Sequence, residues 1–149
     1  MTPIRHLHRA AIAGVLMLAG LASSGGADAL AAEPPDEFSE RVLAALNGYR
    51  ASRGVPALAP SPALSSLAAE HSAAMAARAR PSHDGFAQRF ERSGADLCVE
   101  NVARGFKVPE QVIVGWRGVP THHANMLEPK VRVAGVARSG AYVTFFACG

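Results

Sequence analysis

Polar side chains able to do chemistry stand at three places where the predicted helices and strands begin or end. His83 follows a helical segment, Glu100 and Asn101 lie inside an apolar segment, and His122 belongs to the stretch VPTHHANMLEP near the C-terminus. Binding and catalytic residues are concentrated at such ends and edges, where a rigid scaffold positions them. These four residues are therefore the candidate ligand-binding or catalytic group.

Glu100 is the most informative of the four, because it stands between Val99 and Val102 in a segment that should be buried. A buried carboxylate destabilises the fold unless another group neutralises it or donates hydrogen bonds to it. Together with His83 and His122 it could bind Zn²⁺ and leave one position open for water. Without metal, Glu100 could orient an imidazole that accepts a proton. In the third reading, the three groups only hydrogen-bond one another and tie the loops to the sheet.

Short motifs do not choose between these readings. The sequence contains no HExxH, no GxSxG and no CxxC, so no metalloprotease, serine hydrolase or dithiol signature is present. His71 lies on the apolar face of a predicted helix. A lone histidine in that position is expected to be a hydrogen-bonded core residue and not a ligand.

The first 31 residues have the order of a secretory signal peptide. Arg5 and Arg9 precede the apolar run AAIAGVLMLAGLA, and small residues follow as far as Ala31. Cleavage is expected after Ala31, with Ala29 as the alternative. The apolar run is shorter than the roughly 20 residues that cross a bilayer, so an uncleaved anchor is the less favoured reading. The mature chain then has a flexible lead-in over residues 32–37 and one domain over residues 38–149.

The charge of the mature chain argues against nucleic acid as a partner. The whole chain has 15 basic and 12 acidic side chains, and removing Arg5, Arg9 and Asp28 leaves 13 and 11. The sequence shows no run of Lys and Arg with interleaved aromatic residues, which nucleic-acid-binding proteins commonly carry. The signal peptide predicts export to a periplasm or the extracellular space, without stable membrane insertion after cleavage.

Cys98 and Cys148 are the only cysteines, and both lie in the exported part of the chain. Thiols oxidise in that environment, so the two are expected to form a disulfide bond. The alternative is a pair of buried free thiols.

Helical patterns dominate the first part of the mature chain. Apolar residues at helical spacing predict a helix over residues 37–53, which Asp36 caps and Gly54 ends. A second helix is expected over residues 62–78, with Ser61 as its N-cap and a proline at its first position.

Two further helices and a helical turn are expected before the chain becomes strand-like. A short helix over residues 85–92 would be capped by Asp84. Pro109 opens the next helix, in which Trp116 is expected to be a core anchor, and a last helical turn would begin with Thr121 as its cap.

The C-terminal part reads as strands. Residues 131–135 and 142–148 have the pattern of two strands joined near residues 138–140, and residues 97–102 form a third candidate. Helices come first and strands cluster late, which predicts an α+β domain with helices packed on a small, mainly antiparallel sheet.

An ordered set of residues runs through almost the whole mature chain. The series is Leu46-Asn47-Gly48-Tyr49-Arg50, Gly54, Leu58, Leu64, Ala68, His71, Met75, Ser82-His83, Glu100-Asn101-Val102-Ala103, Trp116, His122-His123-Ala124-Asn125-Met126-Leu127 and Gly135-Val136. It resembles the secreted CAP superfamily, and more narrowly its bacterial SCP-like extracellular branch, from about Phe38 to Phe146.

The resemblance implies an α-β-α sandwich with a cleft lined by two histidines and two glutamates, which in some members of the family hold a divalent metal. His83 and His122 match the two histidines, and Glu100 matches one glutamate. The second glutamate has no counterpart, since Trp116 is followed by Arg-Gly-Val. A metal-free polar cleft is therefore expected, with a zinc site formed by His83, Glu100 and His122 as the alternative. His123 stands where the family usually has an exposed polar residue, so a solvated role is expected.

The resemblance implies fold more firmly than function. The first hypothesis is a secreted module that binds a small ligand, a lipid or a cell-envelope component through His83, Glu100, Asn101 and His122, with Phe86 and Phe106 as further lining candidates. The alternative is a hydrolase, with or without metal, in which His122 acts as base, Glu100 orients it, and His83 polarises a carbonyl or holds the metal. The second alternative is a structural envelope or stress protein with a non-catalytic cleft.

Overall fold

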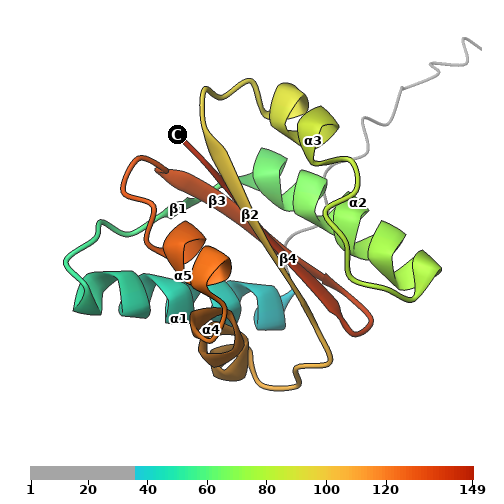
Figure 1. Cartoon of the computed structure of the whole chain (residues 1–149), viewed down its shortest axis with the longest axis horizontal. Coiled ribbons are helices and arrows are strands. Elements are labelled where there is room, and N and C mark those ends of the chain that lie inside the picture. The colour runs from blue at the N-terminus through green and yellow to red at the C-terminus, as the bar shows by residue number, and fades with distance from the viewer. Residues whose placement is uncertain (1–35) are drawn as a thin grey trace, which may run out of the picture. The chain divides into compact units, whose positions relative to one another are not determined.

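The computed structural model describes residues 36–149 (Figure 1). The predicted signal peptide and residues 32–35 of the lead-in lie outside the described residues. The elements in chain order are α1 (Glu37–Ser52), β1 (Ala59–Pro60), α2 (Pro62–Arg78), α3 (Phe86–Ser93), β2 (Cys98–Arg104), α4 (Pro109–Arg117), α5 (Pro120–Met126), β3 (Val133–Ser139) and β4 (Tyr142–Cys148).

The starts of α1 and α2 follow the predicted capping chemistry. The Asp36 side chain accepts a hydrogen bond from the Ser39 amide at 2.7 Å, and the Ser61 hydroxyl accepts one from the Leu64 amide at 3.3 Å. Each bond satisfies an amide that has no partner within the helix. Gly54 has a φ of 70°, as expected for the left-handed residue that follows a helix end.

Two predicted caps are wrong. Gly85 occupies the N-cap of α3 without a side-chain cap, because the carboxylate of Asp84 pairs with Arg80 and Arg78 at the end of α2, at 3.0 and 3.7 Å. Helix α5 begins two residues earlier than predicted. Val119 is its N-cap and a proline takes the first helical position, so Thr121 lies inside the helix.

The sheet has four strands in the order β1-β3-β4-β2. Strand β4 is central and pairs antiparallel with both β2 and β3, while β1 is a two-residue strand parallel to β3. The short β1 was not predicted, because its prolines weaken any strand pattern. Strand β3 begins two residues later than predicted, and β2 extends two residues further. The expected α+β class with a mainly antiparallel sheet is confirmed.

Helices cover both faces of the sheet, which gives the α-β-α sandwich (Figure 1). The alternation of side chains along β4 explains this arrangement. Val143, Phe145 and Ala147 pack in the core beneath α1 and α4, whereas Phe146 packs with Leu64 of α2 on the opposite face. Both faces of β4 are therefore apolar, and each needs a helical layer.

Gly135 allows α2 to lie directly on β3. A Cβ atom added at Gly135 would collide with the backbone of Leu64 and Ser65 in the first turn of α2. Any larger residue would therefore push the helix off the sheet.

The predicted disulfide is present between Cys98 and Cys148, which face each other across the β2–β4 pair. Closing a loop with a sequence separation of 50 residues stabilises the domain by about 4 kcal/mol on the chain-entropy model. The bond fixes the start of β2, two residues before Glu100. Among residues 36–149, no helix has the length and apolarity needed to cross a bilayer.

Candidate functional site

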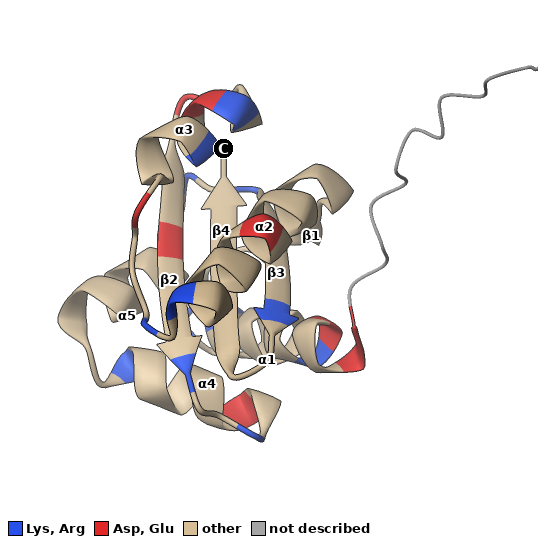
Figure 2. Ribbon diagram, turned by 90° about the vertical axis from the view of Figure 1, so that its right-hand side faces the viewer, with Lys and Arg blue, Asp and Glu red and all other residues tan. Residues whose placement is uncertain are grey.

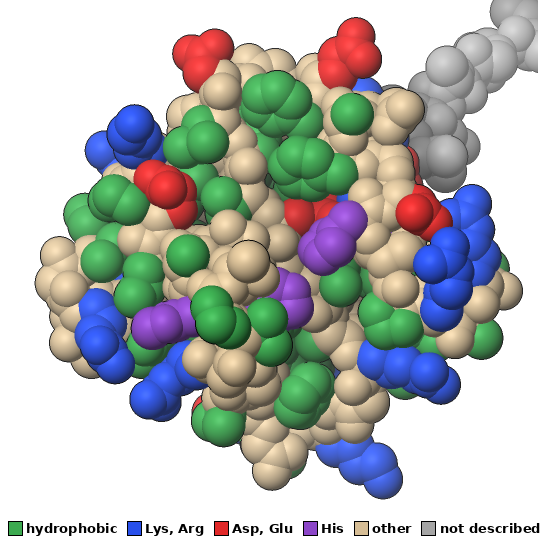
Figure 3. Space-filling view, viewed as in Figure 1, with side chains coloured by type: hydrophobic (Ala, Val, Ile, Leu, Met, Phe, Trp, Pro, Cys, Tyr) green, Lys and Arg blue, Asp and Glu red, His purple; other side chains and the backbone are tan. Residues whose placement is uncertain are grey.

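A cleft of about 380 Å³ lies beside β2, the edge strand of the sheet. Its lining comes from the loop before α3, from β2 and from α5. The lining residues are His83, Phe86, Cys98, Val99, Glu100, Thr121, His122 and Asn125. Figure 3 shows histidine side chains gathered in the middle of this face, with an acidic side chain beside one of them. Folding thus gathers His83, Glu100 and His122 around one hollow.

Glu100 forms the floor of this cleft and holds His83 in place. It is the one acidic residue of β2, which is why that strand carries a red segment in Figure 2. Its side chain is 1% exposed, whereas the His83 side chain is 50% exposed. The Glu100 Oε1 atom lies 2.8 Å from His83 Nδ1. A carboxylate only accepts, so Nδ1 carries the hydrogen, and neutral His83 keeps an unprotonated Nε2 as a hydrogen-bond acceptor.

Arg89 of α3 is the partner of Glu100 that the sequence did not reveal. Its Nε and Nη2 atoms donate to Glu100 Oε2 and Oε1, each at 2.8 Å. Its Nη1 donates to the carbonyl of Asp84 at 2.8 Å. The Arg89 side chain is 8% exposed, so the two opposite charges form a buried, bidentate pair under the cleft.

His71 lies behind this pair, on the α2 side. Its Nε2 atom is 2.7 Å from the Ser82 carbonyl and 3.8 Å from Glu100 Oε1. A carbonyl only accepts, so Nε2 carries a hydrogen. Burial lowers the pKa of His71, although the bond to Ser82 and the charge of Glu100 oppose this. The expected role as a hydrogen-bonded core residue is confirmed, and the residue also borders the site.

His122 occupies the other wall of the cleft. Its ring centroid is 6.4 Å from that of His83, and the two rings meet edge to face. Burial lowers the pKa of His122, and the nearby His83 lowers it further. Both effects favour the neutral imidazole, which offers one donor and one acceptor to a ligand.

Asn101 lies beneath the cleft, with no exposed surface, and joins β2 to α5. Its Nδ2 atom donates to the His122 carbonyl at 2.9 Å. The Nδ2 atom of Asn125 in α5 donates two hydrogen bonds of 3.0 Å, one to the Glu100 carbonyl and one to Asn101 Oδ1. These side-chain amides satisfy polar groups at the open edge of β2. Asn101 therefore positions His122, and its own side chain does not line the cleft.

The comparisons with known proteins concern the family and the fold of the chain. The family profile described as "CAP: Cysteine-rich secretory protein family" matches residues 43–148. This chain belongs to the CAP family. No curated protein sequence matches it.

Solved structures of bacterial CAP proteins share the fold, each with a TM-score of 0.70. An extracellular SCP-domain protein from Bacillus anthracis is 22% identical, and the match covers 74% of this chain and 40% of that one. A cysteine-rich secretory protein from Staphylococcus aureus is 15% identical, over 78% and 39%. An outer surface protein from Borrelia burgdorferi is 16% identical, over 76% and 92%. This chain thus spans about two fifths of the length of the first two.

The donor set of this CAP cleft does not fit the zinc site that the resemblance left open. Both oxygens of Glu100 accept hydrogen bonds from Arg89, and Oε1 also accepts from His83. The second glutamate is absent from the sequence. Within residues 36–149 no group of three His, Cys, Asp or Glu side chains is arranged to hold a metal ion. The guanidinium of Arg89 instead supplies the positive charge beside the carboxylate.

The structure also corrects two residue roles, those of Glu100 and Phe106, and confirms that of Trp116. Glu100 orients His83, whereas the hydrolase hypothesis had it orient His122. Trp116 is a core anchor, 2% exposed, whose Nε1 donates to the Val102 carbonyl at 3.0 Å. Phe106 packs against the main core and does not line the cleft. Phe86 does line it.

His123 has a partner, contrary to the solvated role expected for it. Its Nε2 atom lies 2.7 Å from the Tyr49 hydroxyl, and the residue is half-buried. The side chain contacts α1 and takes no part in the cleft.

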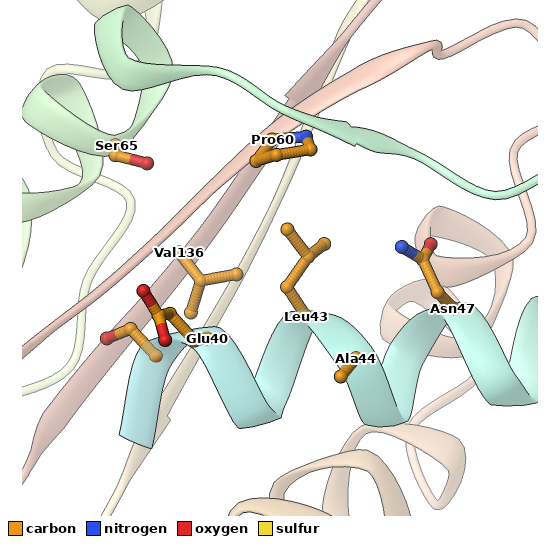
Figure 4. Close-up of a pocket in the computed structure, with 8 residues that line it drawn as sticks. Glu40, Leu43, Ala44, Asn47, Pro60, Ser65 and Val136 are labelled. Carbon is orange, nitrogen blue, oxygen red and sulfur yellow. The ribbon is translucent and has the colours of Figure 1, made fainter. Parts of the chain in front are cut away.

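A second hollow, of about 340 Å³, lies between α1 and the first turn of α2 (Figure 4). Leu43, Ala44, Pro60 and Val136 give it mainly apolar walls. It contains no imidazole, so its chemistry differs from that of the cleft.

Proposed function

We propose that this protein is an exported CAP-domain binding module whose cleft, lined by His83, Glu100 and His122, binds a small polar ligand or a polar part of a cell-envelope component. The expected signal peptide supports export. The disulfide and the relatives described as extracellular or outer surface proteins support it too.

One observation carries the proposal: His83 and His122 face each other at 6.4 Å above a carboxylate that Arg89 already neutralises. On one wall the neutral imidazole of His122 supplies a donor and an acceptor. On the other wall the Nε2 atom of His83 supplies an acceptor, since its Nδ1 already donates to Glu100. Phe86 and Val99 add apolar surface. Such a lining is complementary to an uncharged ligand with hydroxyl or amide groups and one apolar side. Glycan and peptide fragments of a cell envelope have this chemistry.

A hydrolase has weaker support. The Glu100–His83 pair resembles the orienting pair of a general base, but the cleft offers no activated nucleophile. Cys98 is in a disulfide, and Thr121 has no hydrogen bond to either imidazole in the described structure. If the cleft activated a water molecule for hydrolysis, the protein would turn over a substrate, and Glu100→Gln would abolish that activity.

Calorimetric titration of the mature protein tests the proposal. The probes are soluble peptidoglycan fragments, short oligosaccharides and a short-chain phospholipid below its micelle concentration. We expect one probe class to bind, and His83→Ala and His122→Ala to weaken its affinity about tenfold or more by removing buried polar contacts. The matched control is Arg92→Gln, an exposed position on α3.

Two results would contradict the proposal. If His83→Ala and His122→Ala lower only the melting temperature and no probe binds, the cleft has a structural role. If a phospholipid binds with equal affinity to both variants, the second hollow, between α1 and α2 (Figure 4), is the better candidate for the binding site.

A further inference from the structure

A second cluster of polar side chains surrounds Tyr49, and none of its members lines the cleft. The guanidinium of Arg53 lies 5.2 Å from the centroid of the Tyr49 ring, and that of Arg117 lies 4.9 Å from it. The Tyr49 hydroxyl forms the bond to His123 already described. We refer to Tyr49, Arg53, Arg117 and His123 as the Tyr49 cluster. It joins the end of α1 to α4 and α5, and Figure 3 shows basic side chains beside a histidine in this region.

The cluster carries positive charge without a matching anion. Arg53 and Arg117 are exposed, and within residues 36–149 neither guanidinium forms an ion pair with a carboxylate. Five other surface arginines are paired, namely Arg41, Arg78, Arg80, Arg92 and Arg138, whereas the exposed Arg104 and Arg132 form no ion pair within the described residues. Since both guanidiniums contact one ring, they lie within about 10 Å of each other, a distance at which like charges repel in water. An anion between or beside them would relieve this repulsion.

Exposed apolar side chains border the cluster. Val114 is 63% exposed and Val119 is 41% exposed. Val114 precedes Arg117 by three residues on α4, so the two share a helix face. Val119 precedes His123 by one helical turn, and its carbonyl accepts the His123 amide at 2.8 Å. Each exposed valine therefore lies within one helical turn of a member of the cluster, Arg117 or His123.

We propose that the Tyr49 cluster, together with Val114 and Val119, is a docking surface for a bilayer rich in anionic phospholipid. The planar fork of an arginine donates two hydrogen bonds to a phosphate group. Tyrosine is favoured at the boundary between headgroups and acyl chains. The two valines enter this boundary, and charge attraction supplies the rest of the affinity. Docking is peripheral and reversible, and it brings the cleft near the membrane because His122 directly precedes His123.

The test is sedimentation of the mature protein with two kinds of vesicle. One contains equal parts phosphatidylglycerol and phosphatidylcholine, and the other contains phosphatidylcholine alone. We expect binding to the anionic vesicles only, and weaker binding as salt is raised. Arg53→Gln and Arg117→Gln should each lower the partition coefficient about fivefold, the value expected for one basic residue at an anionic surface. Val114→Ser should also lower it.

Arg92→Gln is the matched control, since it removes one exposed positive charge from α3. It should retain nearly the whole affinity. Three results would overturn the proposal: an equal loss in Arg92→Gln and Arg117→Gln, equal binding to both kinds of vesicle, or no binding to either. Because the cleft variants His83→Ala and His122→Ala should bind vesicles normally, this test stands apart from that of the proposed function.

Discussion

The guanidinium of Arg89 donates to both oxygens of the Glu100 carboxylate, at 2.8 Å each, beneath the cleft of this CAP domain. The pair connects α3 to the edge strand β2. Arg89 supplies hydrogen bonds and a positive charge to a buried carboxylate. The Oε1 atom of Glu100 can still accept a hydrogen bond from His83 Nδ1, which fixes the orientation of the His83 ring. The orientation of the cleft histidine therefore depends on an arginine that does not line the cleft.

Replacement of Arg89 by Met should lower the free energy of unfolding by about 3 kcal/mol or more, because it leaves Glu100 buried without its cation. Urea unfolding measures this change. Arg92→Met is the control, since its ion pair with Glu70 is exposed and exposed pairs contribute at most about 1 kcal/mol. The double variant Arg89→Met with Glu100→Met should recover much of the loss. Equal effects of Arg89→Met and Arg92→Met would show that the buried pair is unimportant.

The stability of the domain should fall as the pH drops below about 6.5, the ordinary pKa of histidine. Burial holds the pKa of His71 below that value in the folded protein. The unfolded chain therefore binds a proton at a higher pH than the folded one, and stability is complete above the unfolded pKa and declines from there toward the lowered pKa. His71→Gln, which keeps a donor for the Ser82 carbonyl, should flatten this pH dependence. A wild-type slope retained in the variant would argue against His71 as the cause.

His83 should be present in one tautomer when neutral, with its hydrogen on Nδ1. The carboxylate of Glu100, 2.8 Å away, accepts from that nitrogen only in this form. Nitrogen-15 NMR of the imidazole distinguishes the two nitrogens directly. In Glu100→Gln the amide can donate as well as accept, so the preference should weaken and the Nε2–H form should appear. An Nε2–H tautomer in the wild type would refute the geometry of the pair.

Gly135→Ala should destabilise the domain by about 2 kcal/mol or more, because the new methyl group meets the backbone of Leu64 and Ser65 and forces α2 away from β3. Gly48→Ala is the matched control on α1, where a Cβ atom meets nothing within 4 Å. That change should raise stability by up to about 1 kcal/mol, since it removes a flexible residue from a helix. Thermal unfolding of the two variants should therefore shift in opposite directions.

Local patterns in the sequence predicted much of the fold. Asp36 and Ser61 cap α1 and α2 as their positions indicated, because an N-cap depends on the next three residues only. The cap expected at Asp84 failed because its carboxylate pairs with Arg80 and Arg78, four and six residues earlier in the chain. Residue types alone do not show that Asp84 pairs with these arginines and not with an amide of α3.

Only some residues of the candidate site could be predicted from the sequence. His83, Glu100 and His122 were identifiable because a carboxylate in an apolar segment requires a partner. Arg89 was not, since Arg92 stands three residues further along the same helix and binds the exposed Glu70 instead. Only the packing of α3 against β2 separates the two. The Tyr49 cluster could not be predicted, because its members come from α1, α4 and α5, which are far apart in the chain.

Histidine NMR during a ligand titration shows whether the cleft is the binding site. The mature protein, labelled at its imidazole nitrogens, is titrated with the peptidoglycan or oligosaccharide fragment that binds in calorimetry. We expect the signals of His83 and His122 to shift together with one affinity, while that of His123, which contacts α1, stays in place. Saturable binding that leaves the signals of both His83 and His122 unchanged would rule out the cleft as the binding site.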